Sequence, residues 1–256
     1  MDFTQATQRL SALWNFIKNS FSALFDALFP KCCLVCNMAG EYLCAQHKRN
    51  LLAYVPCCYV CDRPTAHGEV CFDDQNSPCK WVVVGFYYTH IIKEMIHAIK
   101  YANAFEMLDF FVPSLGYAIL ATAPLSQIIQ DETTIITYIP MHWRKEKHHR
   151  WYNQAQLLAE KLAFHLGIPC VQLCQKITNT QKQSSLGKEA RKGNAQDVFQ
   201  WNDLATLQIL WEKKLTILLV DDVLTTGATI DACAKTIKKH LPEANIWGVC
   251  IARNNG

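Results

Sequence analysis

The sequence predicts an α/β protein with a mostly parallel sheet, preceded by a cysteine-rich module. Apolar runs typical of buried strands alternate with helical stretches over the C-terminal part of the chain, which implies parallel strands covered on both faces. Nine of the 13 cysteines lie between Cys32 and Cys79. We therefore divide the chain into a helix at 1–30, a cysteine-rich module at 31–79 and an α/β domain at 80–256.

The composition bounds the class of protein. Half of the 256 residues are hydrophobic, which is enough for a substantial core and excludes a disordered chain. The net charge of +3 does not by itself indicate nucleic-acid binding. No apolar run approaches the roughly 20 residues of a membrane span, and the N-terminus lacks the pattern of a signal peptide. We therefore expect a cytoplasmic protein without a membrane span, in which clustered cysteines indicate metal rather than disulfides.

Residues 6–29 predict an amphipathic helix, because apolar residues recur at the spacing of one helical face and Pro30 ends the pattern. Such a helix docks either on the body of the protein or on a partner or membrane surface. Its polar face carries few basic residues, which argues against anionic lipid.

The α/β domain is expected to alternate strands with helices. Two helices are predicted within 91–120, one at 152–167 that Gly167 ends, and one at 229–241. Residues 175–197 are polar without a steady period and predict a loop. The expected strands are 81–88, 133–140, 168–174, 214–222 and 245–253.

The first set of cysteines has the spacing C-x2-C-x7-C-x2-H, which is typical of a zinc ribbon. Two short turns of this kind present four ligands at the corners of a tetrahedron. The predicted ligands are Cys33, Cys36, Cys44 and His47.

A second set comprises Cys58, Cys61 and Cys71, and its fourth ligand is open. Asp74 completes a C-x2-x spacing after Cys71, His67 is close in sequence, and Cys79 offers a better thiolate. The sequence therefore predicts one or two structural Zn²⁺ ions, with Asp74 as the expected last ligand.

One stretch combines carboxylates with hydroxyls and glycine. In "ILLVDDVLTTGAT", Ile217–Thr229, an apolar strand runs to Asp221 and Asp222 and then turns into a helix. Backbone N–H groups at such a turn bind anions, and Gly227 allows close backbone approach. Carboxylates beside a phosphate-binding loop suit a ribose 5-phosphate, because they would accept hydrogen bonds from its 2- and 3-hydroxyls.

This stretch resembles the phosphoribosyl-pyrophosphate signature of type I phosphoribosyltransferases at every one of its positions. Three further segments are similar to the ComF family of phosphoribosyltransferase-like proteins: "RWYNQAQLLAEKLA" from Arg150, Thr180–Phe199, and "IIKEMIHAIKY" with its Lys100. The resemblance implies a zinc module followed by a type I phosphoribosyltransferase-like sheet. Trp151 departs from the family's usual glycine, and Lys176 stands where an arginine is frequent.

The resemblance implies that phosphoribosyl pyrophosphate binds with Mg²⁺, and that Asp221 and Asp222 are the catalytic carboxylates. The basic loop from Pro140 to Trp151 follows a strand end and would hold pyrophosphate or DNA phosphates, with a hood at 180–194 over the site. The expected phosphate-binding residues are Thr225, Thr226, Gly227, Ala228, Thr229, Arg144, Arg150 and Lys100.

Three functions remain open. The ComF resemblance implies a competence protein that handles incoming single-stranded DNA in natural transformation, together with other DNA-uptake proteins. The second is an active phosphoribosyltransferase with an unknown small-molecule acceptor. The third is an interaction module without chemistry, against which the intact signature counts.

Overall fold

We describe a computed structural model of the chain, which covers residues 31–74, 77–129, 134–141, 152–177, 198–204 and 215–254. The chain divides into two compact units between Leu51 and Leu52. In the described part of the first unit, a cysteine-bearing turn leads into the short helix α2, Ala45–Arg49. The helix expected at 6–29 lies outside the described residues. None of the helices described has the length and apolarity that crossing a bilayer requires.

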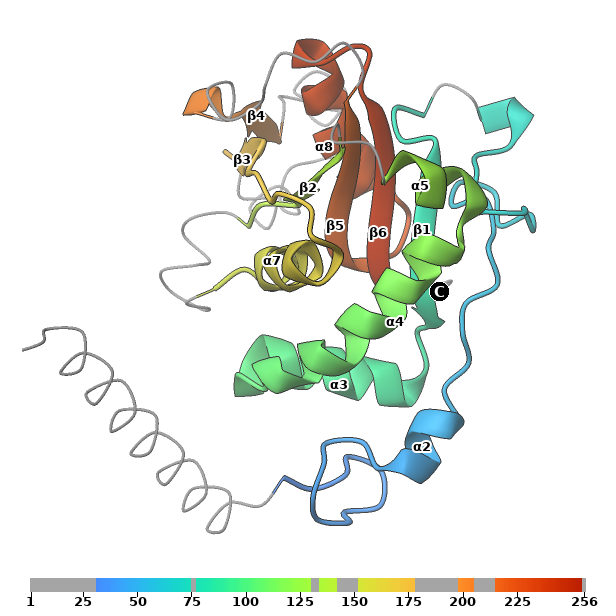
Figure 1. Cartoon of the computed structure of the whole chain (residues 1–256), viewed down its shortest axis with the longest axis vertical. Coiled ribbons are helices and arrows are strands. Elements are labelled where there is room, and N and C mark those ends of the chain that lie inside the picture. Colours follow the sequence, from blue (N-terminus) through green and yellow to red (C-terminus); the bar gives the residue numbers. More distant parts are fainter. Residues whose placement is uncertain are drawn as a thin grey trace, which may run out of the picture. The chain divides into compact units, whose positions relative to one another are not determined.

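The second unit is built on a four-stranded parallel sheet. Its strands are β1 (Trp81–Tyr87), β2 (Thr134–Tyr138), β5 (Thr216–Leu224) and β6 (Asn245–Arg253). They lie in the order β1-β6-β5-β2 (Figure 1), and every pairing is parallel. The prediction of a mostly parallel sheet is therefore confirmed.

Helices cover both faces of this sheet. Helices α4 (Leu108–Ala121) and α7 (Gln154–Leu166) lie over one face, and α8 (Ala228–His240) lies over the other (Figure 1). Ile217 and Leu219 of β5 share a core with Ile230 and Ile237 of α8. Apolar side chains on both sides explain why the strands carry unbroken apolar runs rather than alternation. The remaining helical elements are α3 (His90–Ala102), α5 (Ala123–Ile128) and the 3₁₀ turns η1 (Phe72–Asp74) and η2 (Phe105–Met107).

Local signals fix the helix ends. Gly167 has a φ of 69° at the end of α7, the left-handed conformation that glycine adopts without strain, as the sequence predicted. At the start of α7, the Asn153 side chain accepts a hydrogen bond from the Ala155 N–H.

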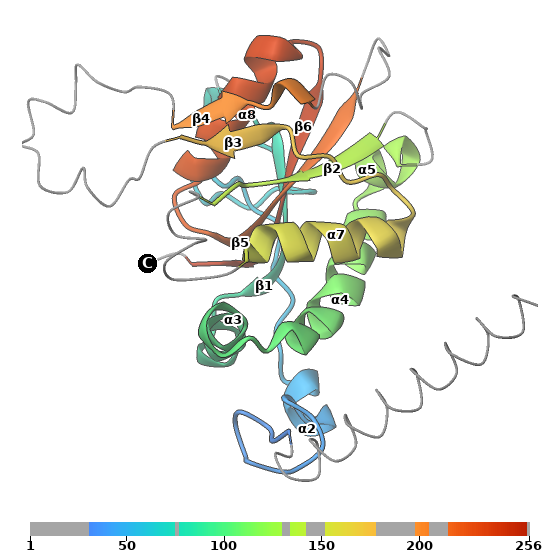
Figure 2. The same ribbon diagram turned by 90° about the vertical axis from the view of Figure 1, so that its left-hand side faces the viewer.

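A short antiparallel hairpin differs from the prediction. β3 (Cys174–Lys176) pairs with β4 (Phe199–Trp201) beside α8 (Figure 2). The strand predicted at 168–174 is wrong over most of its length, since only Cys170 makes an isolated bridge, to Ile136. The loop predicted at 175–197 is also wrong at its first residues. Three-residue strands are too short for a periodicity to reveal them.

The second set of cysteines belongs to the second unit. Ala53 bridges to Phe86 and Glu69 to Trp81, so this segment is attached along β1. The sequence analysis grouped both sets in one module at 31–79, whereas the boundary between the compact units falls between the two sets. The second set is consequently part of the α/β unit.

Candidate functional site

The acidic pair lies near the carboxyl end of β5. The strand continues past Asp221 and Asp222 to Leu224, two residues beyond the predicted end, because β6 pairs with it as far as Arg253. The Asp222 N–H donates to Asp221 Oδ1 at 2.9 Å. Lys100, near the end of α3, brings its Nζ to 2.7 Å from Asp222 Oδ2. The structure thus brings together three of the predicted site residues.

Burial and charge oppose the ionisation of Asp221. Burial, followed by the neighbouring Asp222 carboxylate, raises the pKa of Asp221 to about 7, although the Asp222 N–H, Lys100 and Lys176 act in the opposite direction. Two carboxylates this close favour a bound cation or hydroxyl donors. Lys100 supplies one positive charge from the protein itself.

The predicted phosphate loop joins β5 to α8. Thr225, Thr226, Ala228 and Thr229 are exposed, whereas Gly227 is buried. Gly227 caps α8 with a φ of 75°. The first N–H groups of a helix have no acceptor within the helix, so this turn can receive an anion next to the acidic pair.

Tyr59 covers the buried side of this loop. A Cβ atom added to Gly227 would lie 2.5 Å from Cδ2 of the Tyr59 ring. The Tyr59 hydroxyl donates to Asp231 Oδ1 at 2.6 Å, and the Ser77 hydroxyl donates to the same oxygen at 2.9 Å. Asp231 lies in the first turn of α8. We call Tyr59, Ser77 and Asp231 the clamp.

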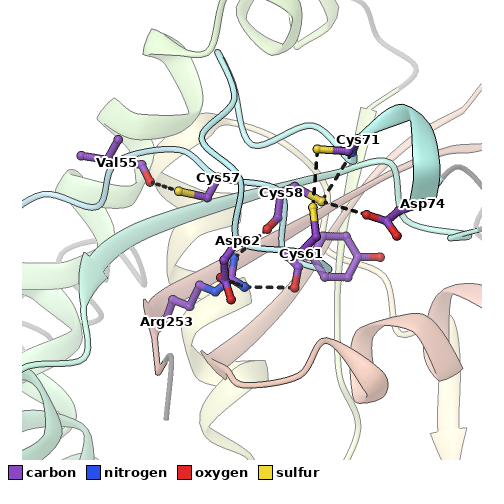
Figure 3. Close-up of polar contacts among 9 residues, drawn as sticks. Val55, Cys57, Cys58, Cys61, Asp62, Cys71, Asp74 and Arg253 are labelled. Carbon is purple, nitrogen blue, oxygen red and sulfur yellow. Dashed lines mark hydrogen bonds and ion pairs between the residues drawn. The ribbon is translucent and has the colours of Figure 1, made fainter.

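Arg253 fastens the same segment to the end of β6. Its side chain is buried, and its Nη1 and Nη2 donate to the carbonyl oxygens of Cys58 and Tyr59 at 3.2 and 3.1 Å. Arg253 also pairs with Asp62, as Figure 3 shows. The segment that carries Cys58 and Tyr59 is therefore attached to both β6 and α8.

The first cluster of side chains that could hold a metal ion comprises Cys33, Cys36, Cys44 and His47, whose potential ligand atoms all lie within 4.8 Å of one another. Cys36 Sγ and Cys44 Sγ are 3.9 Å apart, and Cys44 Sγ is 3.1 Å from His47 Nδ1. Zn–S bonds of about 2.3 Å in a tetrahedron separate two sulfurs by about 3.8 Å. The arrangement fits a structural metal ion.

The second cluster brings together Cys58, Cys61 and Cys71. Asp74 Oδ2 lies 3.8 Å from Cys58 Sγ, on the same side as the other ligands (Figure 3). Cys79 lies apart, because its buried thiol donates to the carbonyl oxygens of Trp81 and Ile246. Among the described residues, neither His67 nor Asp74 belongs to the compact group of three thiols, but Asp74 contacts Cys58 Sγ, so the geometry favours Asp74. We call Cys58, Cys61, Cys71 and Asp74 the second cluster.

The two clusters share one backbone pattern. The Cys33 N–H donates to the Met38 carbonyl and the Asn37 N–H to the Cys33 carbonyl. The equivalent bonds in the second turn join Cys58 to Arg63 and Asp62 to Cys58. Asn37 and Asp62 both have a φ near 60°. This repeat, which the sequence did not reveal beyond its cysteine pairs, makes Asp74 the positional equivalent of His47.

The same backbone pattern tunes the first thiol of each cluster. Burial raises the pKa of Cys33, but N–H groups of Cys44, Cys36 and Val35 outweigh it and lower that pKa to about 6. The pKa of Cys58 is also lowered, by N–H groups of Cys71, Cys61 and Val60 against the effect of burial. Thiolates are the metal-binding form, so both turns are prepared for a cation.

Several expected residues lie outside the described residues. They are Arg144 and Arg150 of the basic loop, Trp151, and the hood at 180–194. Conversely, Tyr59, Asp231 and Arg253 were missed by the sequence analysis. Of these three, only Asp231 has a signal in the sequence, because it is an acidic residue in the first turn of a helix. Such a residue ordinarily indicates a favourable interaction with the helix dipole.

No family model matches the chain. The chain is 27% identical to competence protein F of Haemophilus influenzae, over 84% of this chain and 93% of the relative. It is 27% identical to the DNA utilization protein YhgH of Salmonella typhimurium, over 86% and 97%. It is 23% identical to competence protein ComFC of Bacillus subtilis, over 83% of each. These relatives confirm the resemblance to the ComF family.

We expect Gly227→Ala to destabilise this chain by about 2–5 kcal/mol. The left-handed φ costs a non-glycine residue about 1–2 kcal/mol, and overpacking against Tyr59 adds about 1–3 kcal/mol. Urea denaturation measures the change. Gly167→Ala is the matched control, because Gly167 also has a positive φ but open space at the Cβ position. Equal losses in the two variants would contradict close packing of Tyr59 on the loop.

Asp221→Asn should change how stability depends on pH. An aspartate with a pKa of about 7 in the fold and about 3.9 in the unfolded chain stabilises the fold fully below pH 4. This stabilisation is lost as the pH rises through 7. Asn does not titrate, so the stability of the variant relative to the wild type should rise between about pH 4 and 7, by about 1.4 kcal/mol per pH unit at most, and should level off above pH 7.

Urea denaturation at several pH values measures this gain. Asp109→Asn, which removes an exposed carboxylate of α4, is the control for effects of acid on the metal clusters. A stability difference between Asp221→Asn and wild type that is constant with pH would contradict the raised pKa.

Proposed function

We propose that this protein is a ComF-type competence protein whose α/β unit binds phosphoribosyl pyrophosphate, or a related phosphoribosyl ligand, with Mg²⁺. We propose further that it handles incoming single-stranded DNA in natural transformation. The observation that carries the proposal is the acidic pair, held by Lys100 and followed directly by the glycine-containing turn into α8.

Each part of this arrangement matches a part of the ligand. The exposed threonines and the first N–H groups of α8 suit the 5-phosphate, and the carboxylates of Asp221 and Asp222 suit the ribose hydroxyls. Charged hydrogen bonds of this kind are about twice as strong as neutral ones. Donors for phosphate and acceptors for ribose are therefore adjacent in the chain and in space.

Mg²⁺ bound with the pyrophosphate would offset its negative charge and orient it as a leaving group. Positioned carboxylates near the anomeric carbon would stabilise an oxocarbenium-like transition state, if transfer occurs. Lys100 already neutralises part of the charge of Asp222. Ligand binding would accordingly add its hydroxyls to a site that is preorganised by the protein.

The DNA part of the proposal is supported by the relatives. Their names, competence protein and DNA utilization protein, support a role of this chain in competence. The expected DNA-contacting residues Arg144 and Arg150 carry no structural support, since they lie outside the described residues.

One cavity favours a second candidate, an active phosphoribosyltransferase with a small-molecule acceptor. It has a volume of about 270 Å³ and lies between the end of β2, the start of α7 and β3. Lys176 lines it and also acts on the Asp221 carboxylate. Its amide side chains suit a planar acceptor with donors and acceptors at its edge. They are Asn153, Gln156, Gln172 and Gln175.

The double variant Asp221→Asn, Asp222→Asn tests the ribose role. Each lost charged hydrogen bond should cost roughly 1.5–3 kcal/mol, so binding of phosphoribosyl pyrophosphate with Mg²⁺ should weaken by at least about 100-fold. Isothermal titration calorimetry measures the affinity, and circular dichroism checks that the near-isosteric variant keeps its fold. Unchanged affinity would show that the pair is structural.

The same variant separates the two candidate functions in cells. A deletion strain should be defective in natural transformation, and the double variant should fail to restore it. Normal transformation in the deletion strain would overturn the competence role and favour the transferase. Asp109→Asn, with a similar loss of carboxylate at α4, should restore transformation fully.

We propose that the metal of both clusters is Zn²⁺, with Cys33, Cys36, Cys44 and His47 in the first and the second cluster completed by Asp74. Three thiolates with one nitrogen or oxygen ligand suit this ion. Both sites would be structural, because four protein ligands leave no open position.

Purified protein should contain two zinc ions per chain. Cys58→Ser should lose one of them and destabilise the α/β unit, since metal binding there contributes folding free energy. Asp74→Ala should weaken zinc binding, whereas Asp74→His should keep it by copying the first cluster. Elemental analysis and a competing chelator measure both effects. One zinc in wild type, or full occupancy in Asp74→Ala, would contradict the ligand set.

A further inference from the structure

The second cluster and the phosphate loop are connected by a continuous set of contacts. Cys58 precedes Tyr59, whose ring covers Gly227 and whose hydroxyl bonds Asp231. Ser77, three residues after Asp74, bonds the same carboxylate. Both hydroxyls of the clamp therefore come from residues that lie within three positions of the second cluster in the sequence.

Tyr59 is buried at 2% exposure, so its position leaves little freedom. The oxygen of its hydroxyl also lies 3.1 Å from the Cys79 carbonyl oxygen, and its own carbonyl accepts from Arg253. Tyr59 is thus held both at its backbone and at its hydroxyl. Because Gly227 has no side chain, the ring lies directly against the loop backbone.

We infer that Tyr59 is a positioning residue for the phosphate loop, and that through the clamp the occupied second cluster fixes the first turn of α8 for anion binding. The inference rests on the proposed binding of phosphoribosyl pyrophosphate. It assigns to the cysteine segment of the second unit a role in ligand affinity in addition to its role in folding.

The physical reason is preorganisation. Backbone N–H groups bind an anion tightly only if they already point at it, because ordering a loop during binding costs conformational entropy. Within the clamp, Asp231 accepts hydrogen bonds from two hydroxyl groups. Without these bonds, its negative charge at the start of α8 would oppose an incoming phosphate more strongly. Loss of the clamp should therefore weaken binding even where the fold survives.

Coupling of this kind must be reciprocal. If metal in the second cluster raises the affinity for the ligand, the ligand raises the affinity for the metal by the same factor. The first cluster lies in the other unit, so disabling it with Cys33→Ser and Cys36→Ser leaves a chain whose remaining zinc reports on the second cluster alone.

The first experiment measures affinity for phosphoribosyl pyrophosphate with Mg²⁺ by calorimetry. Tyr59→Phe, which keeps the ring, should bind about 3- to 10-fold more weakly than wild type, and Tyr59→Leu at least tenfold. Asp231→Asn, which keeps an acceptor for both hydroxyls, should stay within about threefold of wild type. Asp109→Ala, which breaks the Lys161 ion pair of 2.5 Å between α4 and α7, is the control and should not change the affinity.

The second experiment measures the zinc affinity of the Cys33→Ser, Cys36→Ser chain with a competing chelator. Saturating phosphoribosyl pyrophosphate with Mg²⁺ should raise this affinity about tenfold, and Tyr59→Leu should abolish the increase. If Tyr59→Leu does not fold, Tyr59→Phe still tests the coupling and should reduce the increase.

The outcomes separate the two proposals. Wild-type protein that binds no phosphoribosyl pyrophosphate would overturn the proposed function, and the inference with it. Wild-type protein that binds, with Tyr59 variants that lose thermal stability but keep full affinity, would overturn the inference alone. A zinc affinity that the ligand does not change would also overturn it.

Discussion

The burial of Asp221 beside a second carboxylate, near the end of a strand, is the constraint on which the site depends. Asp221 and Asp222 are each only partly exposed. Lys100 reaches Asp222 from α3, and the backbone N–H of Asp222 supports Asp221. The raised pKa of Asp221 indicates that this compensation is incomplete. A ligand that brings hydroxyl donors would complete it.

The two copies of the cysteine turn have different structural surroundings. The first copy ends with His47 in a unit of its own, and the second is built into the sheet unit by Arg253 and Tyr59. With Zn²⁺, three thiolates and a neutral imidazole carry a net charge of −1, whereas a carboxylate at the Asp74 position makes it −2. The buried Arg253 guanidinium bonds the backbone of the second turn and pairs with Asp62.

Much of this architecture could be predicted from local patterns. Long apolar runs predicted the parallel strands, the Gly167 signal predicted the end of α7, and the cysteine spacing predicted which thiols lie together. The prediction failed for the short strands, because β3 and β4 are formed by pairing with each other rather than by their own periodicity. The clamp could not be predicted, since Tyr59 and Asp231 are 172 residues apart.

Whether a feature could be predicted depends on how far apart in the sequence its residues lie. Metal ligands and phosphate loops need several groups at short, fixed spacings, so their chemistry is readable within one segment. Support for a site is supplied by whichever buried side chains the fold brings against it. Tyr59 would be an ordinary core aromatic in a sequence, and only its contact with Gly227 gives it a further role. The residues that hold a loop in place are consequently identified by contacts, and the residues that touch the ligand by pattern.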